Sequence, residues 1–184
     1  MRVIAGRFKR RTLLSPTWDG VRPTSDALRE RLFAVLGDRI LDARVLDGCA
    51  GSGAIGIEAL SRGAAEVVFV EHDPRAVSLI GRNLARCGPD LSAHVIRGRL
   101  PHVLDRRRPD PFDIIVLDPP YDAPDIDEIL TGAATHLTAT GMVVLERARR
   151  ASPAIPPTLV STRQIRAGRS MLEWFEPATH DAET

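Results

Sequence analysis

The sequence is short of several residue types, and each shortage narrows what the chain can be. Only two cysteines occur, Cys49 and Cys87, far apart and without a CxxC pair or a histidine cluster. We therefore expect neither a disulfide framework nor a bound metal. No apolar run approaches the ~20 residues that cross a bilayer, and the N-terminus lacks the apolar segment and cleavage site of a signal peptide. These absences predict a cytoplasmic protein that does not bind a membrane.

Lysine is almost missing: Lys9 is the only lysine among the 25 basic residues, although the net charge is just +1. Arginine binds phosphate with a planar fork, but a GC-rich genome would produce the same bias. The position of the charge is more informative, because residues 1–22 hold six basic side chains against Asp19. The densest part predicts an RNA-contacting arm, with a merely solvated basic arm as the alternative. Its residues are Arg7, Lys9, Arg10 and Arg11.

After this arm, apolar strands alternate with amphipathic helices. A helix is expected over 25–36, followed by strands at 45–47, 67–71, 94–96, 112–118 and 142–146 with helices between most of them. Two further extended stretches, 158–165 and 170–175, have a short connection typical of an antiparallel hairpin. The pattern predicts an α/β fold: a doubly wound, mostly parallel seven-stranded sheet with an antiparallel edge hairpin. The expected organisation is a basic arm over 1–24, the α/β domain over 25–176 and a flexible tail over 177–184.

The stretch AGSGAIG, residues 50–56, has the spacing G-x-G-x-x-G, and Glu71 follows Gly51 by twenty residues. This is the fingerprint of a dinucleotide-binding loop. However, Asp47 stands at the end of the preceding strand, and a carboxylate under the loop disfavours a pyrophosphate. S-adenosylmethionine (SAM) carries an ammonium and a sulfonium instead, so acids favour it. Glu71 would accept hydrogen bonds from the ribose hydroxyls, and the glycines would let the backbone approach the methionine portion.

Four strands end in a carboxylate: Asp47, Glu71, Asp118 and Glu146. The carboxyl ends of parallel strands meet at one edge of a sheet, where ligands bind. We therefore expect the first three to take part in a site. For Glu146 we expect only a cap on the following helix.

The fourth strand continues into LDPPYDAP, and Asp118–Tyr121 match the [Asn/Asp]-Pro-Pro-[Tyr/Phe] motif of methyltransferases that modify exocyclic or amide nitrogens. The lone pair of such an amino group is drawn into the ring. Hydrogen bonds from its two N–H groups to the Asp118 carboxylate and the Pro119 carbonyl would orient it for attack on a methyl donor. Pro119 and Pro120 fix the turn, and Tyr121 offers a face on which a base stacks.

With these residues in place, the chain resembles the RsmD family, bacterial methyltransferases that act on guanine N2 in 16S ribosomal RNA. The resemblance covers about residues 1–176 and rests on a set of motifs: RVIAGRFKRRTL, RPTSDALRERLF, VLDGCAGSGAIGIEALSRGA, VVFVEHD, DIIVLDPPY and GRSMLEWF. It implies a SAM-dependent, Rossmann-like domain with an N-terminal extension that helps to hold RNA. The implied substrate is a guanine in 16S rRNA, within a partly assembled small subunit, and a monomeric enzyme is expected.

The resemblance also assigns roles to individual residues. Asp47 and residues 50–53 form the loop on the methionine side of SAM (Ala50, Gly51, Ser52 and Gly53), Glu71 holds the ribose, and His72 lies near the adenine. After the third strand the family usually has an acid that binds the adenine amino group. Here the residues are Arg97-Gly98-Arg99-Leu100, so backbone contacts from Arg99 and Leu100 are expected instead.

The N-terminal family motif supplies the remaining candidates for substrate or RNA contact: Arg22, Thr24, Asp26 and Arg29. Asp26 and Arg29 share a helix face and are placed beside the substrate entrance, with a structural salt bridge as the alternative. Three other functions stay open. A DNA adenine or cytosine amino-methyltransferase would use the same motif but lacks a domain to read DNA. A non-catalytic RNA-binding assembly factor and an NAD-dependent oxidoreductase are the others.

Overall fold

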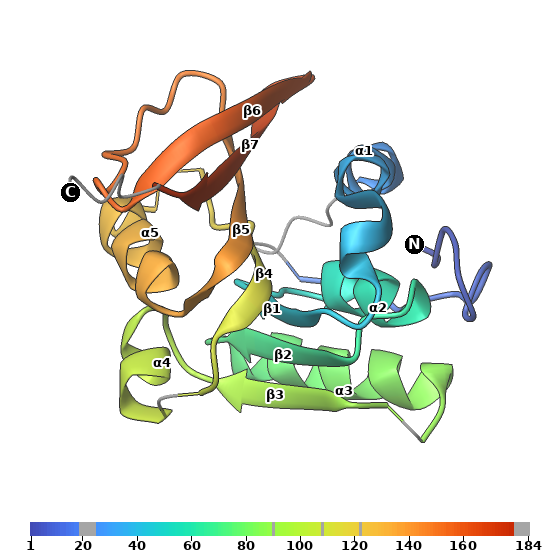
Figure 1. Cartoon of the computed structure of the whole chain (residues 1–184). Helices are drawn as coiled ribbons and strands as arrows, with labels where there is room; N and C mark the ends of the chain where they lie inside the picture. Colours follow the sequence, from blue (N-terminus) through green and yellow to red (C-terminus); the bar gives the residue numbers. More distant parts are fainter. Residues whose placement is uncertain (19–24, 90, 108, 122, 179–184) are drawn as a thin grey trace.

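A computed structural model describes residues 1–18, 25–89, 91–107, 109–121 and 123–178 of the chain (Figure 1). The helices are α1 (Asp26–Leu36), the 3-10 helix η1 (Gly37–Ile40), α2 (Ala54–Ser61), α3 (Pro74–Cys87), α4 (His102–Arg107) and α5 (Ile126–Thr135). The strands are β1 (Arg44–Gly48), β2 (Glu66–Glu71), β3 (Ala93–Arg97), β4 (Phe112–Leu117), β5 (Leu137–Ala148), β6 (Leu159–Ala167) and β7 (Ser170–Pro177).

All seven strands form one sheet in the order β3-β2-β1-β4-β5-β7-β6. The first five are parallel, and β7 joins β5 antiparallel with β6 outside it. The predicted doubly wound sheet with an antiparallel edge hairpin is confirmed. The chain leaves β1 toward one side of the sheet and later returns to place β4 on the other side. A crevice therefore forms at the carboxyl ends of β1 and β4, where α/β proteins bind ligands.

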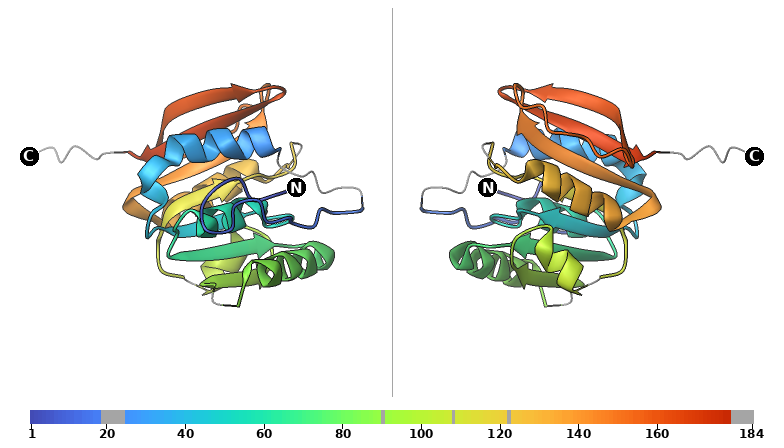
Figure 2. Two further views of the ribbon diagram at one scale, coloured as in Figure 1. Left: turned by 90° about the vertical axis from the view of Figure 1, so that its right-hand side faces the viewer. Right: turned by 90° about the vertical axis from the view of Figure 1, so that its left-hand side faces the viewer.

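Helices cover both faces of the sheet (Figure 2). One apolar cluster joins strand residues such as Val45 and Phe69 to α1, α2 and α3. The second joins Leu46 and Leu117 on the opposite face to α4 and α5. Because successive strand residues point to opposite faces, neighbours such as Val45 and Leu46 belong to different clusters, and the central strands are buried on both sides.

Local sequence signals explain where the helices begin. The Ser25 hydroxyl accepts a hydrogen bond from the Leu28 N–H at the start of α1, and Gly37 follows its last residue with φ 52°. The Asp73 carboxylate accepts from the Arg75 N–H at the start of α3, with Pro74 as the first helical residue. These N-cap and C-terminal glycine patterns are the ones that the sequence displays.

Three elements differ from the sequence prediction, and the first is the 3-10 helix η1, which was not expected. The short helix α4 was not expected, because six residues are too few to show a helical period. Strand β5 begins at Leu137 rather than 142: Phe112 pairs with Leu137, and a register shift follows before Ile114 pairs with Met142. The polar residues of this irregular stretch look like a loop in the sequence.

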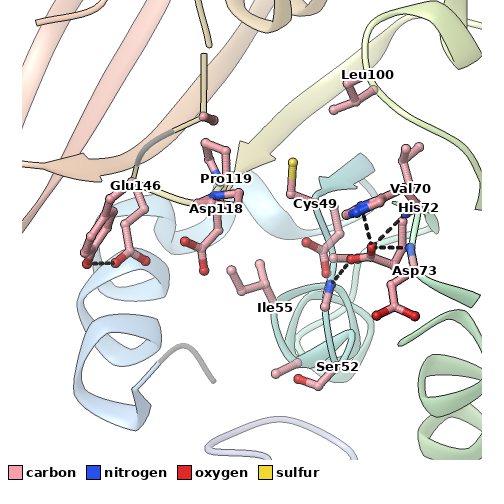
Figure 3. Close-up of a pocket in the computed structure, with 18 of the residues that line it drawn as sticks. Cys49, Ser52, Ile55, Val70, His72, Asp73, Leu100, Asp118, Pro119 and Glu146 are labelled. Atoms are coloured by element: carbon pink, nitrogen blue, oxygen red, sulfur yellow. Dashed lines mark hydrogen bonds and ion pairs between the residues drawn. The ribbon is translucent and has the colours of Figure 1, made fainter. Parts of the chain in front are cut away.

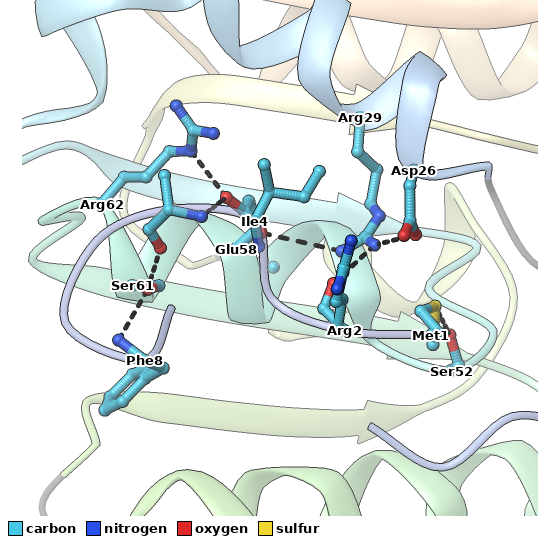
Figure 4. A network of polar contacts seen from close by, with 12 residues as sticks. Met1, Arg2, Ile4, Phe8, Asp26, Arg29, Ser52, Glu58, Ser61 and Arg62 are labelled. Atoms are coloured by element: carbon cyan, nitrogen blue, oxygen red, sulfur yellow. Dashed lines mark hydrogen bonds and ion pairs between the residues drawn. The ribbon is translucent and has the colours of Figure 1, made fainter. Parts of the chain in front are cut away.

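The N-terminal residues were predicted as a hairpin or arm, and they fold back on themselves through one antiparallel bridge, Arg2 to Thr12. Val3, Phe8 and Leu13 are buried in the cluster beneath α1 and α2. The buried Glu58 carboxylate on α2 accepts hydrogen bonds from the Ile4 and Ala5 N–H groups (Figure 4). The described part of the arm is thus attached to the domain core along its length.

Candidate active site

The glycine loop connects β1 to α2, and its glycines serve different purposes. Gly51 and Gly53 have φ values of 56° and 76°, which L side chains rarely adopt. Gly56 lies inside α2 instead, and a Cβ atom there would be 2.3 Å from the Phe69 ring. The third glycine of the spacing therefore permits close packing of α2 on β2, while the first two shape the turn.

Two acids, Asp47 and Glu71, hold this loop in place. The Asp47 carboxylate accepts a hydrogen bond from the Gly56 N–H at 2.8 Å. The Glu71 carboxylate accepts from the Gly51 N–H through one oxygen, and from the His72 and Asp73 N–H groups through the other. A carboxylate offers about four lone-pair sites. Three backbone donors leave Glu71 one acceptor position, on the oxygen that contacts Gly51.

The acids at the strand ends lie close enough to influence one another. Burial, with the nearby Asp118 and Glu71 charges, raises the pKa of Asp47 to about 8, although the Gly56 hydrogen bond opposes the shift. Burial followed by the charges of Glu71 and Asp118 raises the pKa of the Cys49 thiol to about 12. Cys49 is therefore a thiol at neutral pH, and a reactive thiolate is not available there. The region has an excess of negative charge, which favours a cationic ligand.

The motif residues Asp118–Tyr121 follow β4 directly. The Asp118 N–H donates to the Gly48 carbonyl at 3.4 Å, which aligns the start of the motif with the end of β1. The Tyr121 hydroxyl donates to Glu146 Oε1 at 3.2 Å. Pro119 is buried, whereas Pro120 and Tyr121 are exposed at the surface of the pocket.

The interpretation of Glu146 as a helix cap was wrong. The chain continues from β5 through a turn to β6, so no helix begins after Glu146 in the described chain. Its side chain is only 7% exposed and lines the same pocket as Asp118. The sequence contained a signal for this role, since Glu146 follows an apolar run in the same way as the other three acids, although β5 itself continues to Ala148.

One cavity of about 1430 Å³ joins these residues, which exceeds the ~300–1,000 Å³ usual for a small ligand. Most of the predicted cofactor residues line it, namely Asp47, Ala50, Gly51, Ser52, Glu71, His72, Arg99 and Leu100. Gly53 lies behind the loop, where a Cβ would contact Ile80. Sequence reasoning did not identify Trp18, Arg31, Ile55 or Ser170, which also line the cavity.

Comparison with known proteins places the chain in a family. A profile of the family described as conserved hypothetical protein 95 matches residues 1–176. YlbH of Bacillus subtilis, a putative rRNA methyltransferase by name, is 36% identical over 89% of this chain and 92% of its own length. Ribosomal RNA small subunit methyltransferase D of Escherichia coli K12 is 39% identical over 66% of this chain and 60% of its own length. The solved structure of Escherichia coli yhhF matches with a TM-score of 0.84 at 31% identity, covering 96% of this chain and 97% of that one.

The chain belongs to the RsmD family. Its fold is the Rossmann-like fold of methyltransferases. No helix among the described residues is both long and apolar enough to cross a membrane. The described residues also contain no cluster of three or more histidine, cysteine or acidic side chains suited to a metal ion.

Within this RsmD-family chain, the two N-terminal motif residues that the structure describes, Asp26 and Arg29, lie away from the pocket lining. Arg29 is fully buried: its guanidinium donates to the Asp26 carboxylate at 2.6 Å and to the Arg2 carbonyl at 2.8 Å, and it lies 3.7 Å from Glu58 (Figure 4). This is the structural salt bridge that the sequence left open. Neither Asp26 nor Arg29 lines the large cavity. Arg22 and Thr24 lie outside the described residues.

Arg7 of the arm lies at the far end of α2 from the pocket, whereas Lys9 and Arg10 line a small hollow with Asp26 and Glu30 of α1. The Arg7 N–H donates to the Ser61 carbonyl, and Arg11 contacts the Arg86 carbonyl near the end of α3. Because α2 starts at the glycine loop and spans eight residues, its two ends are about 12 Å apart. All four basic side chains of the arm are exposed, namely Arg7, Lys9, Arg10 and Arg11.

A second group of arginines, which the sequence analysis did not single out, lies beside the cavity at the turn between β6 and β7. Gly168 and Ser170, at the turn between β6 and β7, line the cavity, and exposed arginines surround this turn. Arg31 on α1 donates to the Arg166 carbonyl, and the Arg149 N–H donates to the Arg169 carbonyl. We call this set the hairpin arginines: Arg31, Arg149, Arg166 and Arg169.

Proposed function

We propose that this protein transfers a methyl group from SAM to the N2 amino group of a guanine in 16S ribosomal RNA. The observation that carries the proposal is that one cavity is lined by Asp118 and Tyr121 of the DPPY motif together with the glycine loop and Glu71. Relatives that share the motifs are named small-subunit rRNA methyltransferases, and the family resemblance suggests the guanine.

The residues present suit SAM as the methyl donor. Glu71 and Asp118 supply carboxylates to the cavity, which favours a cationic ligand over a pyrophosphate. A bound cation would also lower the raised pKa of Asp47. Gly51 and Ser52 would hold the methionine portion, and Glu71 has one acceptor position left for a ribose hydroxyl. When bound, SAM supplies a methyl group attached to a positively charged sulfur.

Asp118 and Pro119 prepare the acceptor nitrogen. Each N–H of the amino group donates to one of two fixed acceptors, the Asp118 carboxylate and the Pro119 carbonyl. This orientation turns the nitrogen lone pair away from the base ring and supports the positive charge that develops on nitrogen. The side chain of Tyr121 supplies a stacking surface that keeps the base in this orientation.

RNA is the proposed partner because two groups of exposed arginines are available to phosphates. The hairpin arginines have no carboxylate partner among the described residues, and the arm adds a second basic surface. The target base must leave its stack to reach Asp118, which suits a base in a partly assembled small subunit.

The test is to map N2-methylguanine in 16S rRNA from cells that lack the gene. Complementation with the wild type should restore one methylated guanine, whereas Asp118→Ala should not, because its amino-group acceptor is lost. Asp38→Ala, which changes an exposed acid on η1, is the matched control and should restore methylation. If Asp118→Ala is as active as the wild type, the proposed mechanism is incorrect.

A further inference from the structure

Glu146 has an unusual environment for a carboxylate. Its side chain lines the active-site cavity but is only 7% exposed. One oxygen, Oε1, accepts the Tyr121 hydroxyl at 3.2 Å. The other, Oε2, is shielded from solvent and has no hydrogen-bond partner among the described residues. A buried acceptor without a donor is costly, so an unoccupied carboxylate oxygen at a cavity points to a ligand that brings a donor.

The position of Glu146 relative to Asp118 indicates which ligand group this is. Leu117 pairs with Leu145 in the sheet, so the next residues along these two neighbouring chains, Asp118 and Glu146, lie at the same level. Figure 3 shows their two carboxylates extending in the same direction. The Tyr121 hydrogen bond is longer than the ~2.7–2.8 Å usual between oxygens, and the terminal torsion of a glutamate rotates readily. Either oxygen can therefore turn toward a donor that lies next to the group held by Asp118.

We propose that Glu146 recognises guanine by accepting a hydrogen bond from its N1–H while Asp118 holds the neighbouring N2 amino group. This inference rests on the proposed function and adds the residue that selects the base. Guanine carries two adjacent donors on its Watson–Crick edge, at N2 and N1. Adenine and cytosine have a ring nitrogen acceptor beside their amino group, so their lone pair would face the Glu146 carboxylate.

The sharpest probe is 2-aminopurine, which keeps the N2 amino group of guanine but has an acceptor at N1. The experiment compares kcat/KM for particles whose rRNA carries guanine or 2-aminopurine at the mapped position. For the wild type, we expect 2-aminopurine to be at least about 100-fold poorer, because a site built for an N–H donor rejects an analogue without one. For Glu146→Gln, whose amide can donate to N1, we expect this ratio to fall by at least about tenfold.

The ratio separates base recognition from a structural role, because a variant that only loosens Tyr121 would slow both substrates alike. Glu128→Gln, which changes an exposed glutamate on α5, is the matched control and should keep the wild-type ratio. If the wild type methylates guanine N2 but Glu146→Gln leaves the ratio unchanged, Glu146 does not select the base and the proposed function stands. If the wild type leaves guanine N2 unmethylated, both proposals are overturned.

Discussion

The Glu71 carboxylate accepts a hydrogen bond from the Gly51 N–H at 2.8 Å. The acid at the end of β2 is therefore attached to the loop that follows β1. In a dinucleotide fingerprint these two positions are separate contacts to one ligand. Here they also stabilise each other, because the carboxylate satisfies a backbone donor in a turn with positive φ. The spacing of twenty residues thus has a structural reason in addition to any ligand.

Replacing Asp47 with asparagine should stabilise the free protein and weaken SAM binding. The pKa of Asp47 is about 8 in the folded protein and 3.8 in its ordinary environment. Between about pH 4 and 8 the Asp47 carboxyl is therefore protonated in the folded protein but ionised in the unfolded chain. The contribution of Asp47 to the free energy of unfolding falls as the pH rises through this range. An asparagine at this position does not titrate, so the stability advantage of Asp47→Asn should grow steadily over this window, by roughly 1.4 kcal/mol for each pH unit at most.

Urea unfolding of the wild type and Asp47→Asn at pH 5, 6.5 and 8 measures this difference, and calorimetry with SAM measures the loss of affinity. The amide oxygen of the new side chain can still accept the Gly56 N–H, so α2 should remain in place. A stability difference that does not change between pH 5 and 8 would mean that Asp47 does not hold a proton in the folded protein.

Arg29 should matter for stability rather than for RNA. Removing it in Arg29→Met leaves the buried Glu58 without one of its charged neighbours, and breaking a buried ion pair costs about 3–5 kcal/mol. Asp26 is half-exposed, so Asp26→Asn should cost less than about 1 kcal/mol. Urea unfolding gives both values, and faster amide exchange of residues 3–13 in Arg29→Met would show that the arm has loosened. If folded Arg29→Met bound RNA more weakly while the amides of residues 3–13 exchanged as slowly as in the wild type, Arg29 would instead belong to the RNA site.

The sequence predicts the main features of the sheet and most of the cavity because these depend on short local signals. Strand-end acids, helix caps at Ser25 and Asp73, and DPPY each act within a few residues. The remaining features depend on contacts between distant residues. Arg29 is buried because the arm covers it, and Glu146 reaches the cavity because β5 lies beside β4. No local pattern shows the Arg29 contact, and for Glu146 the only local signal is an acid that follows an apolar strand segment.

The two groups of basic residues should contribute differently to RNA binding. Changing Arg166 and Arg169 to glutamine removes charge beside the cavity, so both the affinity for rRNA and the methylation rate should fall. Changing Arg7, Lys9, Arg10 and Arg11 to glutamine should weaken binding with a smaller effect on the rate at saturating RNA. Each lost phosphate contact should reduce the slope of log affinity against log salt by about 0.7–0.9.

Filter binding of rRNA between 50 and 300 mM salt, about the range over which such contacts are screened, gives these slopes. The exposed pair Arg106 and Arg107 on α4 offers a matched double substitution to glutamine with the same change in charge as the hairpin pair. An unchanged slope after the fourfold arm substitution would make the arm a solvated surface, which is the alternative that the sequence left open.

Gly56→Ala should destabilise the protein without changing SAM affinity. The new Cβ would be 2.3 Å from the Phe69 ring, which is fully buried. Overpacking of this kind costs about 1–3 kcal/mol, which outweighs the ~1 kcal/mol that alanine gains over glycine inside a helix. Adding Phe69→Leu should recover part of the loss, since the smaller side chain accommodates the methyl group. Thermal unfolding of the single and double variants measures this coupling. A Gly56→Ala protein of normal stability that binds SAM poorly would instead show that the third glycine of the fingerprint faces the cofactor.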